Sequence, residues 1–165
     1  MEQKPFKKPF ILGIDPGLSG ALALLNPTTN LAHKIWDFPL SPQGAGGKNI
    51  INASILAAEL SAIIGDVEIA IIEDVHAMPG QGVTSMFGFG VSKGLVIGML
   101  HAFKCPVFTV PPAVWKGVYG LSSNKDASRA LASKKFPNSS YLWTRKKDDG
   151  RAEALLLADF GRRFY

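Results

Sequence analysis

The run Val67–Ile72 constrains the fold more than any other stretch of the sequence. It is dense in apolar and β-branched residues and ends directly at Glu73-Asp74. Runs of this kind are typical of parallel strands whose two faces are both covered by helices. We therefore expect an α/β chain in which a buried strand delivers a carboxylate to its own carboxyl end.

The segments on either side of this run predict the rest of the sheet. Three apolar runs separated by tight turns come first and indicate an antiparallel meander: Phe10–Ile14, Gly20–Leu25 and Leu31–Phe38. A further short buried strand is expected over Pro106–Val110. Pro39–Lys48 and Asn138–Lys147 are predicted to be loops because proline, glycine and polar residues are frequent in them.

Helical spacing and capping residues predict helices over Asn52–Ile64, Val83–Phe103, Asn124–Phe136 and Asp149–Phe164, with a short helical turn over Ala113–Val118. Four glycines in the second of these helices, Gly88, Gly90, Gly94 and Gly98, are expected to permit close approach to the sheet or to another helix. The whole order predicts a mixed five-stranded sheet, three antiparallel strands and then parallel strands, with helices on both faces. This order matches the ribonuclease H-like fold.

Length and composition place limits on the organisation and on the partners. The 165 residues fit one domain, 1–165, with a flexible N-terminus over residues 1–8. The single cysteine, Cys105, excludes a disulfide framework and suits a buried position in a reducing compartment. We find neither a run of 18 apolar residues nor a signal peptide, so we expect no membrane partner and a cytoplasmic location, in a nucleoid or a phage-infected cell. An organelle stays open as the alternative.

Positive charge is concentrated in the last third of the chain. Residues 101–165 contain 12 Lys and Arg against 5 Asp and Glu, whereas residues 1–100 contain 6 against 8. A basic face of this kind binds phosphates in nucleic-acid-binding proteins. A solvated helical surface has the same composition, so charge alone does not decide between the two.

Acidic residues stand where two predicted strands end and where the last helix begins. Asp15 and Glu73 each follow an apolar strand, and acids at the carboxyl ends of neighbouring parallel strands meet at one edge of the sheet. Asp149 and Glu153 are four residues apart and share a face of the last helix, which is unfavourable for like charges unless a cation lies between them. Asp148 fits helix capping, but it remains an alternative ligand.

Carboxylates without a His or Cys cluster are ligands for hard cations. They indicate Mg²⁺, for which Mn²⁺ can substitute, and no small-molecule cofactor. Two such ions per site can activate a water molecule and stabilise the leaving oxygen of a phosphodiester. The acidic residues therefore suggest a metal-dependent nuclease.

Three blocks of the sequence resemble RuvC-type Holliday junction resolvases, especially the phage, bacterial and chloroplast branches. Gly13–Leu24, which contains Gly-Ile-Asp-Pro-Gly, resembles the first motif of that family, and Ile71-Ile72-Glu73 resembles the second. Lys146–Leu156, with the sequence Lys-Lys-Asp-Asp-Gly-Arg-Ala-Glu-Ala-Leu-Leu, resembles the last. The resemblance extends from about residue 10 to residue 162.

The resemblance implies roles for individual residues. Asp15, Glu73 and Glu153 match acidic metal-binding and catalytic positions, and the remaining position is Asp149 or Asp148. Glu153 stands where the family usually has Asp. Lys116 and Lys125 resemble basic residues near the scissile phosphate, where a lysine neutralises developing charge. The residues expected to contact DNA are His76, Met78, Gln81, Lys116, Lys125, Arg129, Lys146, Lys147 and Arg151.

The implied function is that of a crossover junction endodeoxyribonuclease, a hydrolase acting on phosphodiester bonds. It would resolve four-way DNA junctions by paired cuts, for use in recombination and repair. Paired symmetric cuts imply a homodimer, for which the glycine-rich helix over Val83–Phe103 offers a surface. Two alternatives stay open: a related nuclease acting on other branched DNA or on RNA, and an inactive module that binds branched nucleic acid.

Overall fold

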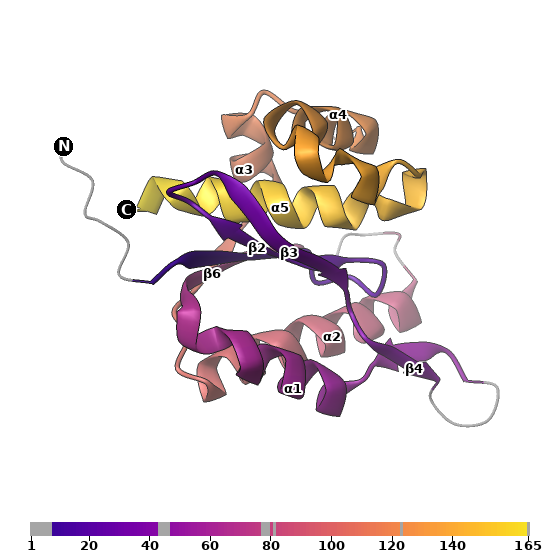
Figure 1. Ribbon diagram of the computed structural model, residues 1–165. Helices are drawn as coiled ribbons and strands as arrows, with labels where there is room; N and C mark the ends of the chain where they lie inside the picture. The colour runs from indigo at the N-terminus through magenta and orange to yellow at the C-terminus, as the bar shows by residue number, and fades with distance from the viewer. Residues whose placement is uncertain (1–7, 43–46, 77–79, 81, 123, 165) are drawn as a thin grey trace.

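The computed structural model describes residues 8–42, 47–76, 80, 82–122 and 124–164, whose main feature is a five-stranded sheet with helices on both faces (Figure 1). In spatial order the strands are β3 (Leu31–Asp37), β2 (Ala21–Asn26), β1 (Phe10–Ile14), β6 (Val67–Glu73) and β7 (Val107–Val110). β1, β2 and β3 pair antiparallel, whereas β6 is parallel to both β1 and β7. The predicted mixed five-stranded sheet is therefore confirmed.

The helices form two layers, one on each face of the sheet (Figure 1). α1 (Ala53–Ile63) and α2 (Val83–Ala102) cover one face, and α3 (Pro112–Val118), α4 (Lys125–Lys135) and α5 (Asp149–Gly161) cover the other. Successive side chains of β1 point to opposite faces of the sheet. Ile11 therefore packs in the core formed with α5, and Leu12 packs in the core formed with α1 and α2. Cys105 is buried, as expected, and burial raises the pKa of its thiol to about 11.

Three predictions about local structure were wrong. Within the expected loop Pro39–Lys48, β4 (Leu40–Pro42) pairs with β5 (Asn49–Ile51) as a separate two-stranded sheet. The second expected loop, Asn138–Lys147, is largely 3-10 helix, and the last helix becomes 3-10 after Gly161. The short 3-10 segments are η1 (Ile64–Asp66), η2 (Pro137–Trp143), η3 (Lys146–Asp148) and η4 (Arg162–Phe164). Segments this short show no periodicity that a sequence pattern can reveal.

α2 is largely exposed, as α1 is, whereas α5 is almost wholly buried. Only Ser92, Val96 and Leu100 of its twenty residues are buried. A Cβ atom added at Gly88, Gly90, Gly94 or Gly98 would meet no atom within 4 Å, so the expected close approach to the sheet was wrong at these positions. By length and composition α2 could cross a membrane, with a mean hydropathy of 1.5 and 17% of the window buried. The core helix of a soluble protein passes the same test, so one such helix is weak evidence for a membrane span.

Candidate active site

Asp15 and Glu73 lie side by side at the carboxyl edge of the sheet. β1 and β6 are parallel, and Ile14 is opposite Ile72 in the register, so the next residue of each chain segment is the acid. Glu73 is only 6% exposed, and Asp15 is half-buried. The strand ends therefore bring two carboxylates from distant parts of the sequence together, as the pattern predicted.

Two glycines bring other backbone segments close to Asp15. An added Cβ at Gly20 would lie 2.1 Å from the carbonyl oxygen of Asp15, so only glycine fits this turn. An added Cβ at Gly150 would lie 2.7 Å from the carbonyl oxygen of Ser19 and 3.1 Å from Oδ2 of Asp15. The first turn of α5 consequently lies against the Asp15 carboxylate.

α5 adds two buried carboxylates to the same end of the sheet. Asp149 is the first residue of the helix and Glu153 lies one turn later, with exposed fractions of 6% and 4%. Oε1 of Glu153 is 2.9 Å from Nζ of Lys116 and accepts a hydrogen bond of 2.9 Å from the hydroxyl of Ser128. The ammonium of Lys116 thus supplies positive charge to a carboxylate that burial would otherwise destabilise.

α3 connects the strand acids with the acids of α5. The indole N–H of Trp115 donates a hydrogen bond of 2.9 Å to Oε1 of Glu73, and the neighbouring Lys116 binds Glu153. The Lys116 ammonium also lies 5.1 Å from the centre of the Trp115 ring. The sequence pointed to Lys116 but not to Trp115 or Ser128. Adjacency to Lys116 could have indicated Trp115, whereas nothing in the sequence distinguishes Ser128 from other helical serines.

The two adjacent aspartates at the start of α5 have different surroundings. Nε and Nη2 of Arg145 donate to the two carboxylate oxygens of Asp148 at 2.8 and 2.9 Å. This ion pair holds the pKa of Asp148 below its usual range. Asp148 is therefore engaged by a guanidinium three residues earlier, whereas Asp149 shares a helix face with Glu153.

The expected DNA-contacting residues are spread over several elements. His76 is largely exposed and lies 3.3 Å from Asp74, whose pKa is lowered by its hydrogen bond with Lys93. Arg151 binds both carboxylate oxygens of Asp37, so its guanidinium already has a partner. Lys146 and Lys147 are exposed in η3 just before α5. Lys125 begins α4, but its side chain lies outside the described residues, as do Met78 and Gln81.

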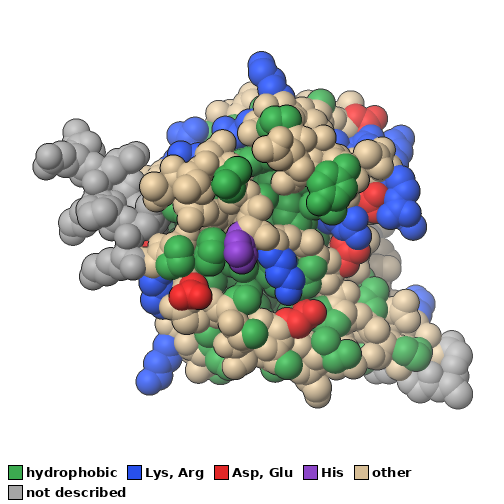
Figure 2. Space-filling model, viewed as in Figure 1, with side chains coloured by type: hydrophobic (Ala, Val, Ile, Leu, Met, Phe, Trp, Pro, Cys, Tyr) green, Lys and Arg blue, Asp and Glu red, His purple; other side chains and the backbone are tan. Residues whose placement is uncertain are grey.

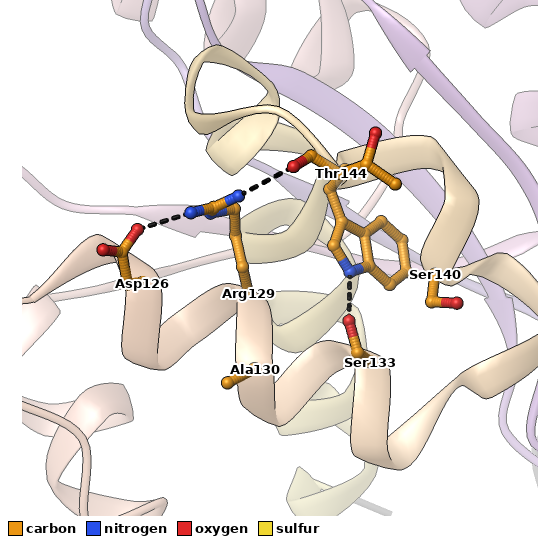
Figure 3. Close-up of a pocket in the computed structure, with 7 residues that line it drawn as sticks. Asp126, Arg129, Ala130, Ser133, Ser140 and Thr144 are labelled. Atoms are coloured by element: carbon orange, nitrogen blue, oxygen red, sulfur yellow. Dashed lines mark hydrogen bonds and ion pairs between the residues drawn. The ribbon is translucent and has the colours of Figure 1, made fainter.

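Arg129 lies at an open pocket of about 430 Å³ between α4 and η2 (Figure 3). Its guanidinium bridges the Asp126 carboxylate and the carbonyl oxygen of Thr144. In the same view the indole of Trp143 donates to the hydroxyl of Ser133 at 2.9 Å. Lys and Arg side chains also gather along the upper right edge of the face in Figure 2. Arg129 of α4, Lys146 and Lys147 of η3 and Arg151 of α5 belong to the helical layer that carries the acids of α5.

The chemistry of these acids fits a hard divalent cation. Asp15, Glu73, Asp149 and Glu153 come from β1, β6 and α5 and offer only oxygen donors, as Mg²⁺ and Mn²⁺ prefer. Among the described residues, no three His, Cys, Asp or Glu side chains are close enough to hold an ion as they stand. The ammonium of Lys116 is bound to Glu153. A metal ion that binds Glu153 would have to replace this ammonium as the positive charge beside the carboxylate.

Fold and site together define a ribonuclease H-like α/β protein with acids at the carboxyl edge of its sheet. Over 94% of this chain the fold is similar to Thermus thermophilus RuvC solved in complex with a Holliday junction substrate, with a TM-score of 0.68, 16% identity and 95% of that chain covered. It is also similar to the yeast mitochondrial Holliday junction resolvase Ydc2, with a TM-score of 0.60, 15% identity and coverage of 99% of this chain and 80% of that one. These likenesses establish the fold.

A sequence relative is the chloroplastic Holliday junction resolvase MOC1 of Chlamydomonas reinhardtii. It is 34% identical over 124 residues, which are 69% of this chain and 13% of that protein. The chain thus spans about an eighth of the length of this relative. No protein-family model matches the chain. The resemblance to RuvC-type resolvases that the three sequence blocks indicated is confirmed in sequence and in fold.

Proposed function

We propose that this chain is a divalent-metal-dependent, structure-selective endonuclease that resolves four-way DNA junctions by paired phosphodiester hydrolysis. The observation that carries the proposal is the gathering of acids from β1, β6 and α5 at one end of the sheet, with Lys116 beside them. The relative is described as a Holliday junction resolvase, which supports the same activity. The metal is proposed to be Mg²⁺, two ions per site, with Mn²⁺ as a substitute.

Each side chain of the site has a defined task in this proposal. When bound, the two ions supply an activated water and charge stabilisation for the leaving oxygen. Asp15, Glu73, Asp149 and Glu153 hold the negative charge that binds them. Lys116, whose side chain is 16% exposed, can turn its ammonium from Glu153 toward a phosphate oxygen and neutralise charge that develops there. Lys125 is proposed for the same task.

A homodimer would supply the two sites that paired cuts require. α2 offers the surface, since Val83, Phe87 and Val91 are 86%, 74% and 54% exposed on this helix. Gly94 and Gly98 continue the same side of the helix with open space around them, which permits a second backbone to approach closely. A second copy of the chain would place its own α2 there, related by a two-fold axis.

The cellular location remains a proposal as well. The relative is described as chloroplastic, which favours an organelle over the cytoplasm that we expected for this chain. The same chemistry would serve recombination and repair of DNA in either compartment.

The decisive experiment offers the protein a mobile four-way junction and a linear duplex of the same sequence, in Mg²⁺ and in EDTA. We expect symmetric cuts in the junction, at least tenfold faster than in the duplex, only with Mg²⁺. Asp15→Asn should abolish cutting and retain junction binding in a mobility-shift assay. Equal cutting of both substrates would favour a less selective nuclease. Binding without any cutting would favour the inactive binding module.

A further inference from the structure

Two fully buried side chains outside the proposed ligand set donate hydrogen bonds to acids of the site. Trp115 and Ser128 both have 0% exposure. The Trp115 indole N–H contacts Oε1 of Glu73, and the Ser128 hydroxyl contacts Oε1 of Glu153, each at 2.9 Å. They come from α3 and α4, two different helices of the layer that contains α5.

These bonds determine how the two carboxylates can be oriented. A buried indole N–H or hydroxyl that loses its partner costs free energy, so each donor restrains the rotation of its glutamate. On Glu153, both Ser128 and Lys116 contact Oε1. If Lys116 moves away, Ser128 still holds Oε1, and Oε2 keeps its direction.

We propose that Trp115 and Ser128 are positioning residues, which hold one oxygen of Glu73 and of Glu153 and thereby orient both carboxylates toward a divalent cation. This inference rests on the proposed metal-dependent function. Partners of this kind fix the orientation of metal ligands in many proteins, and their loss typically weakens metal binding by roughly 10–100-fold. Neither residue needs to touch DNA to have this effect.

The chain contains matched internal controls for both residues. Trp143 is 2% exposed and donates its indole N–H to Ser133 at 2.9 Å, in the interface of α4 and η2 (Figure 3). Trp36 donates to the carboxylate of Glu59 at 3.1 Å, on the other side of the sheet. The indole N–H of Trp143 thus donates to a hydroxyl, and that of Trp36 donates to a carboxylate outside the site. The indole N–H of Trp115 donates to a proposed metal ligand.

Nuclear magnetic resonance of the intact protein tests the proposal without any substitution. The three indole N–H groups give three resolved signals in a ¹H–¹⁵N spectrum. Titration with Mg²⁺ is expected to shift the Trp115 signal while those of Trp36 and Trp143 stay in place. If Mg²⁺ supports cutting but the Trp115 signal does not move, Glu73 is not oriented through Trp115 and that half of the proposal fails.

Substitutions provide the second readout. Trp115→Phe and Ser128→Ala should each raise the dissociation constant for Mn²⁺, followed by its electron paramagnetic resonance, by about tenfold or more. The Mg²⁺ concentration that gives half-maximal cutting should rise in parallel, whereas metal-free junction binding should not change. Trp143→Phe and Ser133→Ala remove a similar buried bond and should leave the Mn²⁺ affinity unaltered.

The outcomes separate the two proposals. A wild-type protein that binds Mn²⁺ and cuts junctions, with variants that bind Mn²⁺ equally well, overturns the positioning roles alone. Loss of Mn²⁺ binding in the control variants to the same degree also overturns them, because the effect would then be general destabilisation. A wild-type protein that neither binds Mn²⁺ nor cuts any nucleic acid overturns the proposed function.

Discussion

α5 and α2 are two helices of this molecule whose surroundings differ strongly. Both are largely apolar and contain glycine, and they lie on opposite faces of the sheet (Figure 1). All residues of α5 except Arg151 are buried, whereas α2 buries only three residues of twenty. Apolar composition alone therefore does not reveal which helix lies in the core.

The space around the glycines also shows that α5 is closely packed and α2 is not. An added Cβ at Gly13 of β1 would lie 2.0 Å from the carbonyl oxygen of Ala154 in α5, and one at Gly161 would lie 2.7 Å from Ile71. Added Cβ atoms at Gly94 and Gly98 of α2 would meet nothing within 4 Å. Close packing fixes α5 and the acids it carries, whereas α2 keeps an exposed apolar surface.

The largest expected effect concerns the chemistry of α5. Asp149→Asn should lower the rate of junction cutting by roughly a thousandfold, because an acid that neutralises a metal ion contributes several kcal/mol to the transition state. Asp148→Asn should lower it by less than about tenfold, since its carboxylate is bound by Arg145. Single-turnover cleavage at saturating protein measures both. The reverse order would assign the ligand to Asp148.

Packing around α5 gives the next effect. Gly13→Ala should destabilise the fold by roughly 3 kcal/mol, because α5 must move away from β1 to admit the methyl group. Gly98→Ala in α2 should instead be neutral or add about 0.5–1 kcal/mol, through the better helix propensity of alanine. Thermal melting, with the molecular mass measured alongside, compares the two. Equal destabilisation would mean that both helices pack equally closely.

The apolar surface of α2 gives a smaller effect, confined to association. Phe87→Glu should weaken the proposed homodimer by about tenfold or more, because a charge would be buried in the interface, and it should leave the fold intact. Sedimentation equilibrium over a range of concentrations measures the dissociation constant. Tyr141→Glu is a suitable control, because Tyr141 is an aromatic residue with 71% exposure on η2, in the helical layer on the other face of the sheet. A monomeric wild-type protein would refute the assignment of α2 to self-association.

The sequence was sufficient for the sheet and for the main acids. Apolar runs bounded by turn signals predicted every strand of the large sheet, and parallel pairing of β1 with β6 brings the strand-end residues Asp15 and Glu73 together. The spacing of Asp149 and Glu153 predicted their common helix face. These are local patterns, or direct consequences of topology, which is why they can be read from one sequence.

The features that escaped prediction depend on tertiary contacts. Trp115 and Ser128 reach the acids across 42 and 25 residues of sequence, and no local pattern relates them to their partners. The glycines of α2 and those that face α5 also look alike in the sequence, although only the second group lies against backbone atoms. Helix spacing had already favoured Asp149 over Asp148, and the structure adds the ion pair of Asp148 with Arg145.

The smallest expected effect is a pH dependence at the start of α5. Arg145 lowers the pKa of Asp148 in the folded protein, so this pair contributes stability above the pKa of an unfolded aspartate, about 3.9, and loses it as the pH falls through the lower folded value. Arg145→Gln should therefore lower the melting temperature at pH 7, and by progressively less as the pH falls and Asp148 becomes protonated. The effect is small because the Arg145 side chain is 59% exposed. Lys147→Gln removes the same charge from an exposed neighbour and serves as the control. If both variants lose the same stability at pH 7, the cause is net charge and not the bond to Asp148.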